Sequence, residues 1–476
     1  MVLHNEQSEA FAAWLPQCRW FSAKNIPDFK RHMRSIDYID ISDHPEGGES
    51  LKLAVIRVAI ARGETTFLAP VLVHFNQHSI MECRDAATDP TMSKWLLDLI
   101  QSGRSLQTAA GTFVGHSVHQ HEGQFSTIEC TSALSENASN TSVFFTTQDV
   151  YENSVGYVSK LFRTYHIGIQ PEVEVGLHLA QNGWSGAPPL VGWLEYIATG
   201  EEQGGAVATV HEALTPTTDA WTYSIKTLSE DRHASDTLLC MATRVGILTA
   251  DMHTVLANSQ SSPAFAPVTP SDEEKRENSH IMMDHAQSVW DLLSTANVPS
   301  PFQQRVRAVL TQQQRLMETL EAVAHLEQTA AYIRVHGDYH LGQLLIDQSH
   351  KTLHVIDFEG EPGRTLEERR GKTSIFKDLA GMSRSFEYLC HRTENRAPHV
   401  EAADLTRAFL KAYSDKANGQ CFYPDTKGEA GKLLNAFMLD KAIYELAYEA
   451  QYRPDWLDTP LSAVENFLRT GCFLVV

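Results

Sequence analysis

The sequence predicts an α+β protein whose first part is rich in strands and whose second part is mostly helical. Apolar or alternating runs such as Leu51 to Ile60 and Thr65 to Phe75 are typical of strands. Beyond about Trp221, apolar residues recur at helical spacing, as in Leu238 to Ala257. A chain of 476 residues exceeds the size at which one hydrophobic core stops growing, so we expect two or three structural units.

Two helical patterns interrupt the strands of the first part. The first begins with Asp89 as a cap and ends at Gly103, and the second, Glu172 to Gly183, also ends at a glycine. The strands expected around these helices span residues 111–118, 141–147, 155–163, 187–196 and 206–214. The first part is therefore expected to hold a small sheet, a helix and then a second group of strands.

In the second part we expect two long helices, over residues 279–296 and 302–329, and further helices from Lys377 onward. Residues 258–278 are rich in Ser, Pro and charge, which predicts a long surface loop.

Composition excludes some classes of function. Fifty-nine acidic and 39 basic residues give a net charge of −20, which opposes general binding to nucleic acid or to anionic membranes. No run of 18 apolar residues predicts a membrane span, and no leader pattern is present. The seven cysteines are scattered without a CxxC pair, as expected of reduced thiols in a cytoplasmic protein.

The stretch IRVHGDYHLGQLLID, Ile333 to Asp347, raises three interpretations. His336 and His340 with Asp338 could form a zinc site for metal-dependent hydrolysis, or the histidines could simply pack and cap. Gly337 between two apolar runs favours a loop over a helix, and a loop would not place both histidines on one face. The third interpretation is a catalytic loop.

Phosphoryl transfer requires a carboxylate near the attacking hydroxyl and oxygen ligands for Mg²⁺. The sequence offers Asp338, then Gln343 five residues later, then Asp357 in HVIDFEGEP. Asp338 would orient a sugar hydroxyl, while Gln343 and Asp357 would bind the cation. Glu359 is either another metal ligand or a solvated neighbour.

The strand-rich part supplies a candidate for binding nucleotide phosphates. Lys160, in the strand YVSKLFR, would point at the phosphates of ATP, and Glu172 or Glu174 from the next helix would hold it; we prefer Glu174, because Leu177 and Leu179 follow it on an apparent buried face. A GxGxxG loop is absent, so SENASNTSVFF would cover the phosphates. The candidates within it are Ser139, Asn140 and Thr141.

These residues together resemble the actinobacterial maltokinases, which are relatives of the aminoglycoside phosphotransferases. The resemblance rests on VHGDYHLGQLL, VIDFEGEPGRTLEERRGKTSIFKDLAGMSRSFEY and LDKAIYELAYEAQYRPDW, and it extends to WFSAK, SENASNTSVFF, YVSKLFR and PEVEVGLHLA. It implies a bilobal, protein-kinase-like α+β fold with an additional N-terminal β-rich cap and a mostly helical C-lobe. The implied segments are a cap over 1–88, an intermediate segment and N-lobe over 89–208, and a C-lobe over 209–476.

The resemblance also implies an activity. The expected reaction is the phosphorylation of maltose on its anomeric hydroxyl by ATP and Mg²⁺, giving maltose 1-phosphate for α-glucan (glycogen) synthesis. A hinge near Ala208 to Ala213 would pair with adenine, with His211 and Ala213 as candidate contacts. Association with a trehalose synthase stays open. Tyr339, Ser383 and the pair Gln451 and Tyr452 depart from the family pattern and bear on packing or sugar preference.

The sugar pocket is expected on a C-terminal helix. A set of polar residues recurs there at spacings of three and four, which places them on one face: Lys441, Tyr444, Glu445, Tyr448 and Glu449. A solvated face with ion pairs is the alternative. His336 and Arg364 are further candidates for the sugar, while Arg369 and Arg370 either contact it or steady the acidic loop.

Two other functions stay open beside maltose phosphorylation. The same fold could phosphorylate another sugar, an amino sugar or an aminoglycoside. The chain could also be a catalytically silent, nucleotide-binding partner of a trehalose-metabolising enzyme, but this predicts the loss of Lys160, Asp338 or Asp357, and all three are present.

Overall fold

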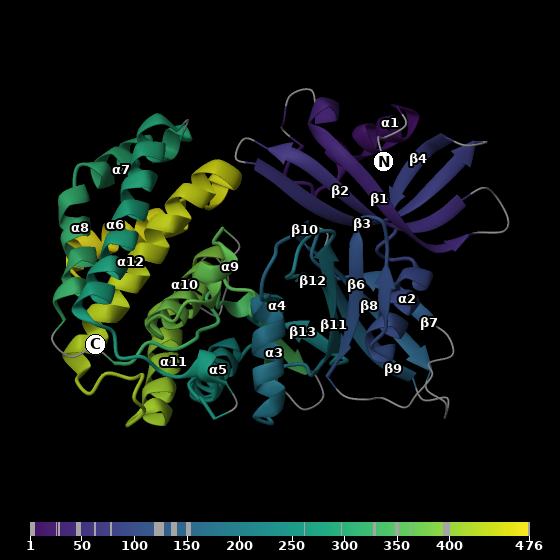
Figure 1. Ribbon diagram of the computed structural model, residues 1–476. Coiled ribbons are helices and arrows are strands. Elements are labelled where there is room, and N and C mark those ends of the chain that lie inside the picture. The colour runs from purple at the N-terminus through teal and green to yellow at the C-terminus, as the bar shows by residue number, and fades with distance from the viewer. Residues whose placement is uncertain are drawn as a thin grey trace. The chain divides into compact units, whose positions relative to one another are not determined.

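The computed structural model describes residues 5–24, 26, 29–43, 49–60, 63–76, 79–118, 128–134, 140–148, 154–260, 262–296, 298–326, 330–347, 352–361, 363–393 and 400–474. The chain forms two compact units (Figure 1). The first comprises residues 1–180 and 188–215, and the second comprises residues 181–187 and 216–476. The segments expected over 1–88 and 89–208 thus lie in one unit, and their separation into two domains stays a prediction.

The first unit contains two sheets. The smaller sheet has the order β1-β2-β3-β10, with β4 also paired to β3, and the larger has the order β5-β6-β11-β12-β9-β8-β7. The strands of the smaller sheet are β1 (Met33–Asp43), β2 (Glu49–Ile60), β3 (Gly63–Asn76), β4 (Ser79–Asp85) and β10 (Thr164–Tyr165). Those of the larger sheet are β5 (Ser105–Gln107), β6 (Gly111–Ser117), β7 (Ile128–Ala133), β8 (Thr141–Gln148), β9 (Ser154–Leu161), β11 (Leu190–Ala198) and β12 (Gly205–Glu212).

Three helices pack within this unit, namely α1 (Asn5–Trp14), α2 (Pro90–Ser102) and α3 (Pro171–Gln181). The capping prediction for α2 is confirmed: the Asp89 carboxylate accepts from the N–H of Thr91, and Gly103 ends the helix with a φ of 59°. Helix α2 packs so closely on the larger sheet that Gly115 and Gly192 admit no Cβ without a clash with Leu99, Ile100 or His116.

The two sheets are not packed independently. One core cluster combines residues of the smaller sheet, such as Leu53 and Leu68, with Leu97 of α2 and Leu194 and Val210 of the larger sheet. The short strand β10 comes from the second half of the unit but pairs with β3. The cap expected over 1–88 therefore shares buried apolar surface with the strands that follow it.

The second unit is mostly helical, as predicted. Its helices are α4 (Ala220–Glu230), α5 (Ala234–Leu256), α6 (Asp272–Thr295), α7 (Ser300–Leu310), α8 (Gln313–Glu321), α9 (Leu366–Arg370), α10 (Phe376–Thr393), α11 (Ala402–Ala417), α12 (Lys427–Tyr452) and α13 (Asp458–Thr470). A small sheet, β13-β14-β15, is formed by Thr217–Asp219, Leu344–Asp347 and Leu353–Val355. Helix α12 packs against both α10 and α6 (Figure 1).

Two predicted boundaries in this unit were wrong. The expected loop over residues 258–278 ends early, because Ser271 and Glu274 form a capping box that starts α6 at Asp272. The expected helix over 302–329 is two helices, α7 and α8, because the chain turns at Thr311 and Gln312 before a new helix begins. Helical spacing of apolar residues continues across that turn, so periodicity did not reveal it.

In the part of the chain that the structure describes, no helix combines the length and apolar character needed to cross a membrane.

Candidate functional site

The loop that carries Asp338 is held by a buried carboxylate from α10. The backbone N–H groups of His336 and Gly337 donate to Asp378 over 2.7 and 2.8 Å, and His253 Nε2 lies 3.1 Å from the same carboxylate. Burial alone raises the pKa of Asp378, but these bonds and His253 outweigh it, so this pKa lies below its usual value. Gly337 has a φ of 86°, which a side chain would disfavour. The loop is therefore fixed at the residue before Asp338.

The two histidines of HGDYH make bonds within the loop. His336 is buried, and its Nε2 lies 2.8 Å from the carbonyl of Ile356, while His340 Nδ1 accepts from the N–H of Gly342. Within the described ranges, neither histidine belongs to a group of three metal-ligand side chains close enough to hold an ion. This geometry favours a structured catalytic loop over a zinc site. His336, predicted to touch the sugar, instead holds the loop to the strand before Asp357.

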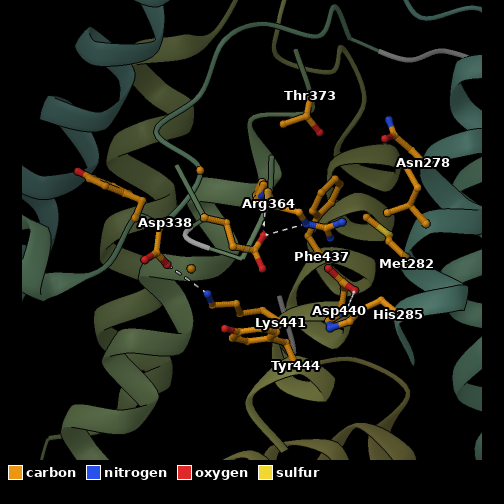
Figure 2. Close-up of a pocket in the computed structure, with 16 residues that line it drawn as sticks. Asn278, Met282, His285, Asp338, Arg364, Thr373, Phe437, Asp440, Lys441 and Tyr444 are labelled. Carbon is orange, nitrogen blue, oxygen red and sulfur yellow. Dashed lines mark hydrogen bonds and ion pairs between the residues drawn. The ribbon is translucent and has the colours of Figure 1, made fainter. Parts of the chain in front are cut away.

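Asp338 lies at a pocket of about 100 Å³, called the Asp338 pocket below. Its Oδ1 is 3.4 Å from Nζ of Lys441, which projects from α12 (Figure 2). Burial raises the pKa of Asp338 by itself, but Lys441 and the nearby histidines lower it further, so the net pKa is below its usual value. Of the predicted sugar contacts, the pocket is lined by Asp338, Arg364, Lys441 and Tyr444.

A second charged group lines the same pocket. The carboxylate of Glu361 lies 3.3 Å from Lys377 and 3.6 Å from Arg364. Burial raises the pKa of Glu361, but the cations Lys377, Lys441 and Arg364 outweigh it and lower the pKa. Two carboxylates, Asp338 and Glu361, are thus ionised beside fixed cations.

Sequence reasoning missed the part of the pocket wall that comes from α6. His285 of α6 lies 3.2 Å from Asp440 of α12, and Asn278 and Met282 lie on the same wall (Figure 2). The positions 278, 282 and 285 follow helical spacing. The predicted loop ended just before them, so no signal marked them as a site. Lys377 and Glu361 stood in the FEGEP block and could have been found there.

Two predicted sugar contacts, Glu445 and Glu449, do not line the pocket, and this prediction was wrong. Glu445 lies 2.6 Å from Nη2 of Arg384, which is 1% exposed and also contacts Glu387. Glu449 accepts from the hydroxyl of Tyr388 and from Arg453. Spacing of four residues placed both on one face, but that face turns into the protein interior, where they pair with buried side chains.

The predicted metal ligands cluster after β15. Asp357 has a φ of 69°, and it is the one non-glycine residue in the described ranges with a positive φ. Such backbone strain is typical of functional positions. Gln343 Nε2 donates to Asp357 Oδ2 over 2.8 Å, and Glu359 lies 3.6 Å from Arg369. Two carboxylates and an amide are oxygen donors of the kind that a hard cation such as Mg²⁺ prefers, so these residues fit that ion.

In the first unit, the predicted lysine has a carboxylate partner, but the preferred one was wrong. Nζ of Lys160 in β9 donates to Glu172 Oε2 over 2.8 Å, whereas the sequence argument preferred Glu174. Glu172 is 6% exposed and shares the buried side of α3 with Val175 and Leu179, and Glu174 is only partly buried. The expected face was rotated, because Leu177 proved to be partly exposed.

The remaining nucleotide candidates lie around β8 and β12. Thr141 begins β8 and its hydroxyl accepts from Arg163, Asn140 precedes it, and Ser139 lies outside the described residues. Burial and the nearby Lys160 lower the pKa of His211 to about 4, so its imidazole is neutral at pH 7. The N–H of Ala213 donates to the carbonyl of Gly156, so adenine could pair with this group only by displacing that bond.

Comparisons with known proteins define the class of the chain. Residues 131–360, from β7 to the glycine after Glu359, match the model of the phosphotransferase enzyme family. This segment belongs to that family, and the chain has its kinase-like α+β fold, as predicted.

Particular relatives are glucosamine kinases. A glucosamine kinase of Streptacidiphilus jiangxiensis is 26% identical over 304 residues, covering 61% of this chain and 64% of the relative, which is less than two thirds of its length. A solved glucosamine kinase in complex with glucosamine, ADP and inorganic phosphate has a TM-score of 0.65 at 20% identity, covering 92% of this chain and 94% of that one. A second glucosamine kinase structure (crystal form B) has a TM-score of 0.63 at 20% identity and covers 97% and 99% of the two chains. At these identities the structures establish a shared fold.

Proposed function

We propose that the chain is an ATP-dependent kinase that phosphorylates a hydroxyl group of a sugar held in the Asp338 pocket. The observation that carries this proposal is the position of Asp338, which lies at a polar pocket on a loop fixed by Asp378. A bond forms between the sugar oxygen and the γ-phosphorus while the bond to the departing ADP oxygen breaks, and Asp338 accepts the hydroxyl proton. Because the transition state is loose, catalysis depends mainly on positioning and charge.

The cofactors that we propose are ATP and Mg²⁺. Asp357 and Gln343 would hold the ion, with Glu359 as a further oxygen donor, and Lys160 would contact phosphate groups of the nucleotide. Mg²⁺ would neutralise the charge of the phosphates during transfer. The buried pair of Lys160 with Glu172 supports this role, because it fixes the ammonium on a central strand of the larger sheet.

An amino sugar such as glucosamine is the leading candidate for the acceptor. The relatives named as glucosamine kinases support it. Asp440 supports it as well, because this carboxylate lines the pocket beside an imidazole, whereas Asp338 and Glu361 lie beside lysine or arginine. A carboxylate without a fixed cation beside it can bind the ammonium group of an amino sugar.

Maltose is the second candidate. It is supported by the FEGEP block, whose Glu361 and Arg364 line the pocket, and by Lys441 and Tyr444, which belong to the other segment that resembles the maltokinases. In that case the product would be maltose 1-phosphate, a donor for α-glucan synthesis.

Coupled ADP release with glucosamine, glucose, maltose and kanamycin tests the proposal. We expect turnover with at least one sugar, and ³¹P NMR of the product identifies the hydroxyl that is phosphorylated. A response to glucosamine but not to maltose selects the amino sugar, and the reverse selects maltose. Turnover with kanamycin alone would contradict a sugar kinase.

A further inference from the structure

Three tyrosines of α12 form a row that leads away from the Asp338 pocket. Tyr444, Tyr448 and Tyr452 are four residues apart and so lie on one side of the helix. The ring centroids of Tyr444 and Tyr448 are 6.2 Å apart with the rings stacked, and those of Tyr448 and Tyr452 are 5.1 Å apart. We call these three residues the tyrosine ladder.

The ladder begins in the pocket and becomes more exposed along its length. Tyr444 lines the pocket, Tyr448 is 39% exposed and Tyr452 is 69% exposed. A large apolar side chain usually gains by burial, so neighbouring exposed rings next to a pocket are a recognised sign of a binding surface. The ladder adds little to the core of the second unit, because Glu445, Leu446 and Glu449 form the buried side of α12 there.

Cations hold the ladder in place. The guanidinium of Arg453 lies 5.0 Å from the ring centroid of Tyr448 and 4.9 Å from that of Trp456, and Glu449 binds it over 2.7 Å. Lys441 lies 5.1 Å from the ring centroid of Tyr444. Rings that are fixed before a ligand arrives lose little side-chain freedom on binding, which favours affinity.

The chemistry of the ladder matches that of a sugar chain. A pyranose ring presents a face of C–H groups, which packs on an aromatic ring, and a rim of hydroxyls, which bond to a phenol oxygen. From Tyr444 to Tyr452 the helix rises about 12 Å, roughly the length of two linked hexose rings.

We propose that the tyrosine ladder is an outer subsite that binds the second and third rings of an oligosaccharide acceptor, while its first ring occupies the Asp338 pocket. This inference rests on the proposed sugar kinase function and narrows the acceptor to compounds longer than one ring. The acceptor may not exceed the ladder without leaving its aromatic contacts, so a fourth ring adds no affinity.

Saturation-transfer difference NMR without ATP tests the subsite directly. Maltotriose and cellotriose serve as probes, and they distinguish α-1,4 from β-1,4 linkage. We expect saturation of the ring protons on all three rings of the preferred trisaccharide. Saturation confined to one ring, or none with either trisaccharide, would overturn the proposal.

Variants supply the second readout. Tyr452→Ala should weaken binding of the preferred trisaccharide about tenfold, the loss expected for one well-placed aromatic contact. It should also lower the ratio of kcat/KM for the trisaccharide to kcat/KM for a single-ring acceptor. Gln451→Ala, at an exposed neighbouring position on α12, is the matched control. Equal effects of the two substitutions, or an unchanged ratio in Tyr452→Ala, would contradict the subsite.

The two proposals fail in different ways. Binding of a trisaccharide without turnover of any sugar would overturn the kinase and leave the subsite standing. Turnover of single-ring sugars without contact to outer rings would overturn the subsite and leave the kinase standing.

Discussion

The carboxylate of Asp338 and the ammonium of Lys441 lie 3.4 Å apart, although 103 residues separate them in the sequence. One comes from a loop that precedes the small sheet and the other from α12 (Figure 2). The pair keeps Asp338 ionised at the pocket, and it therefore links the acceptor residue Lys441 to the protonation state of the proposed proton acceptor.

Replacing Lys441 should change the pH dependence of the reaction. Asp338 must be ionised, so activity is lost as the pH falls through its pKa, and Lys441 lowers that pKa. In Lys441→Met the effect of burial dominates, so the acid limb of the kcat/KM profile should move to higher pH. Profiles of both proteins measured by ADP release check this. An acid limb at the wild-type position would show that Lys441 does not control Asp338.

The two glutamates of α3 should differ in their effect on nucleotide use. Glu172→Gln removes the charge that holds Lys160, so we expect KM for ATP to rise about tenfold, equivalent to about 1.4 kcal/mol. Glu174→Gln is the matched control on the same helix, and its effect should be smaller. Initial rates at varied ATP concentration decide, and a larger effect of Glu174→Gln would restore the interpretation made from the sequence.

Asp357 should set the requirement for Mg²⁺. Asp357→Asn removes the negative charge proposed to bind the ion, so half-maximal activity should need much more Mg²⁺ and the maximal rate should fall by about 100-fold or more. Gln343→Leu should have the same direction with a smaller change, because it removes a neutral ligand. Titration of activity with Mg²⁺ measures both effects. An unchanged Mg²⁺ dependence in Asp357→Asn would exclude this residue as a ligand.

Glu445 should matter for stability. Glu445→Ala leaves the buried guanidinium of Arg384 with Glu387, so we expect a loss of about 2–3 kcal/mol in the free energy of unfolding. Asp404→Ala, which breaks the exposed pair with Arg407, should cost about 0–1 kcal/mol. Urea denaturation compares them. Equal losses would mean that the buried pair contributes no more than a surface pair.

Much of the fold could be predicted from local signals. The cap at Asp89, the stop at Gly103 and the change from strands to helices near residue 220 depend on neighbouring residues, and the structure confirms them. The break between α7 and α8 was missed, because Gln312 and its neighbours carry neither proline nor glycine. Helix ends of this kind depend on tertiary packing.

The candidate site was predicted in part. Asp338, Arg364, Lys441 and Tyr444 line one pocket, and a motif or a helical spacing pointed to each of them. The wall from α6, with His285, was not predicted, because nothing in a single sequence brings α6 beside α12. A third kind of error concerned Glu445 and Glu449, whose spacing gave the right helix but not which side of it faces the pocket.

The most direct test of the central claim is the turnover of Asp338→Asn beside the wild type. Sugar-dependent ADP release is measured with the acceptor that the wild type prefers, and binding of ATP is measured separately by calorimetry. If Asp338 positions the acceptor hydroxyl and takes its proton, the variant loses about 1,000-fold or more in kcat while its affinity for ATP stays near that of the wild type. A variant that phosphorylates the sugar at close to the wild-type rate would contradict the account.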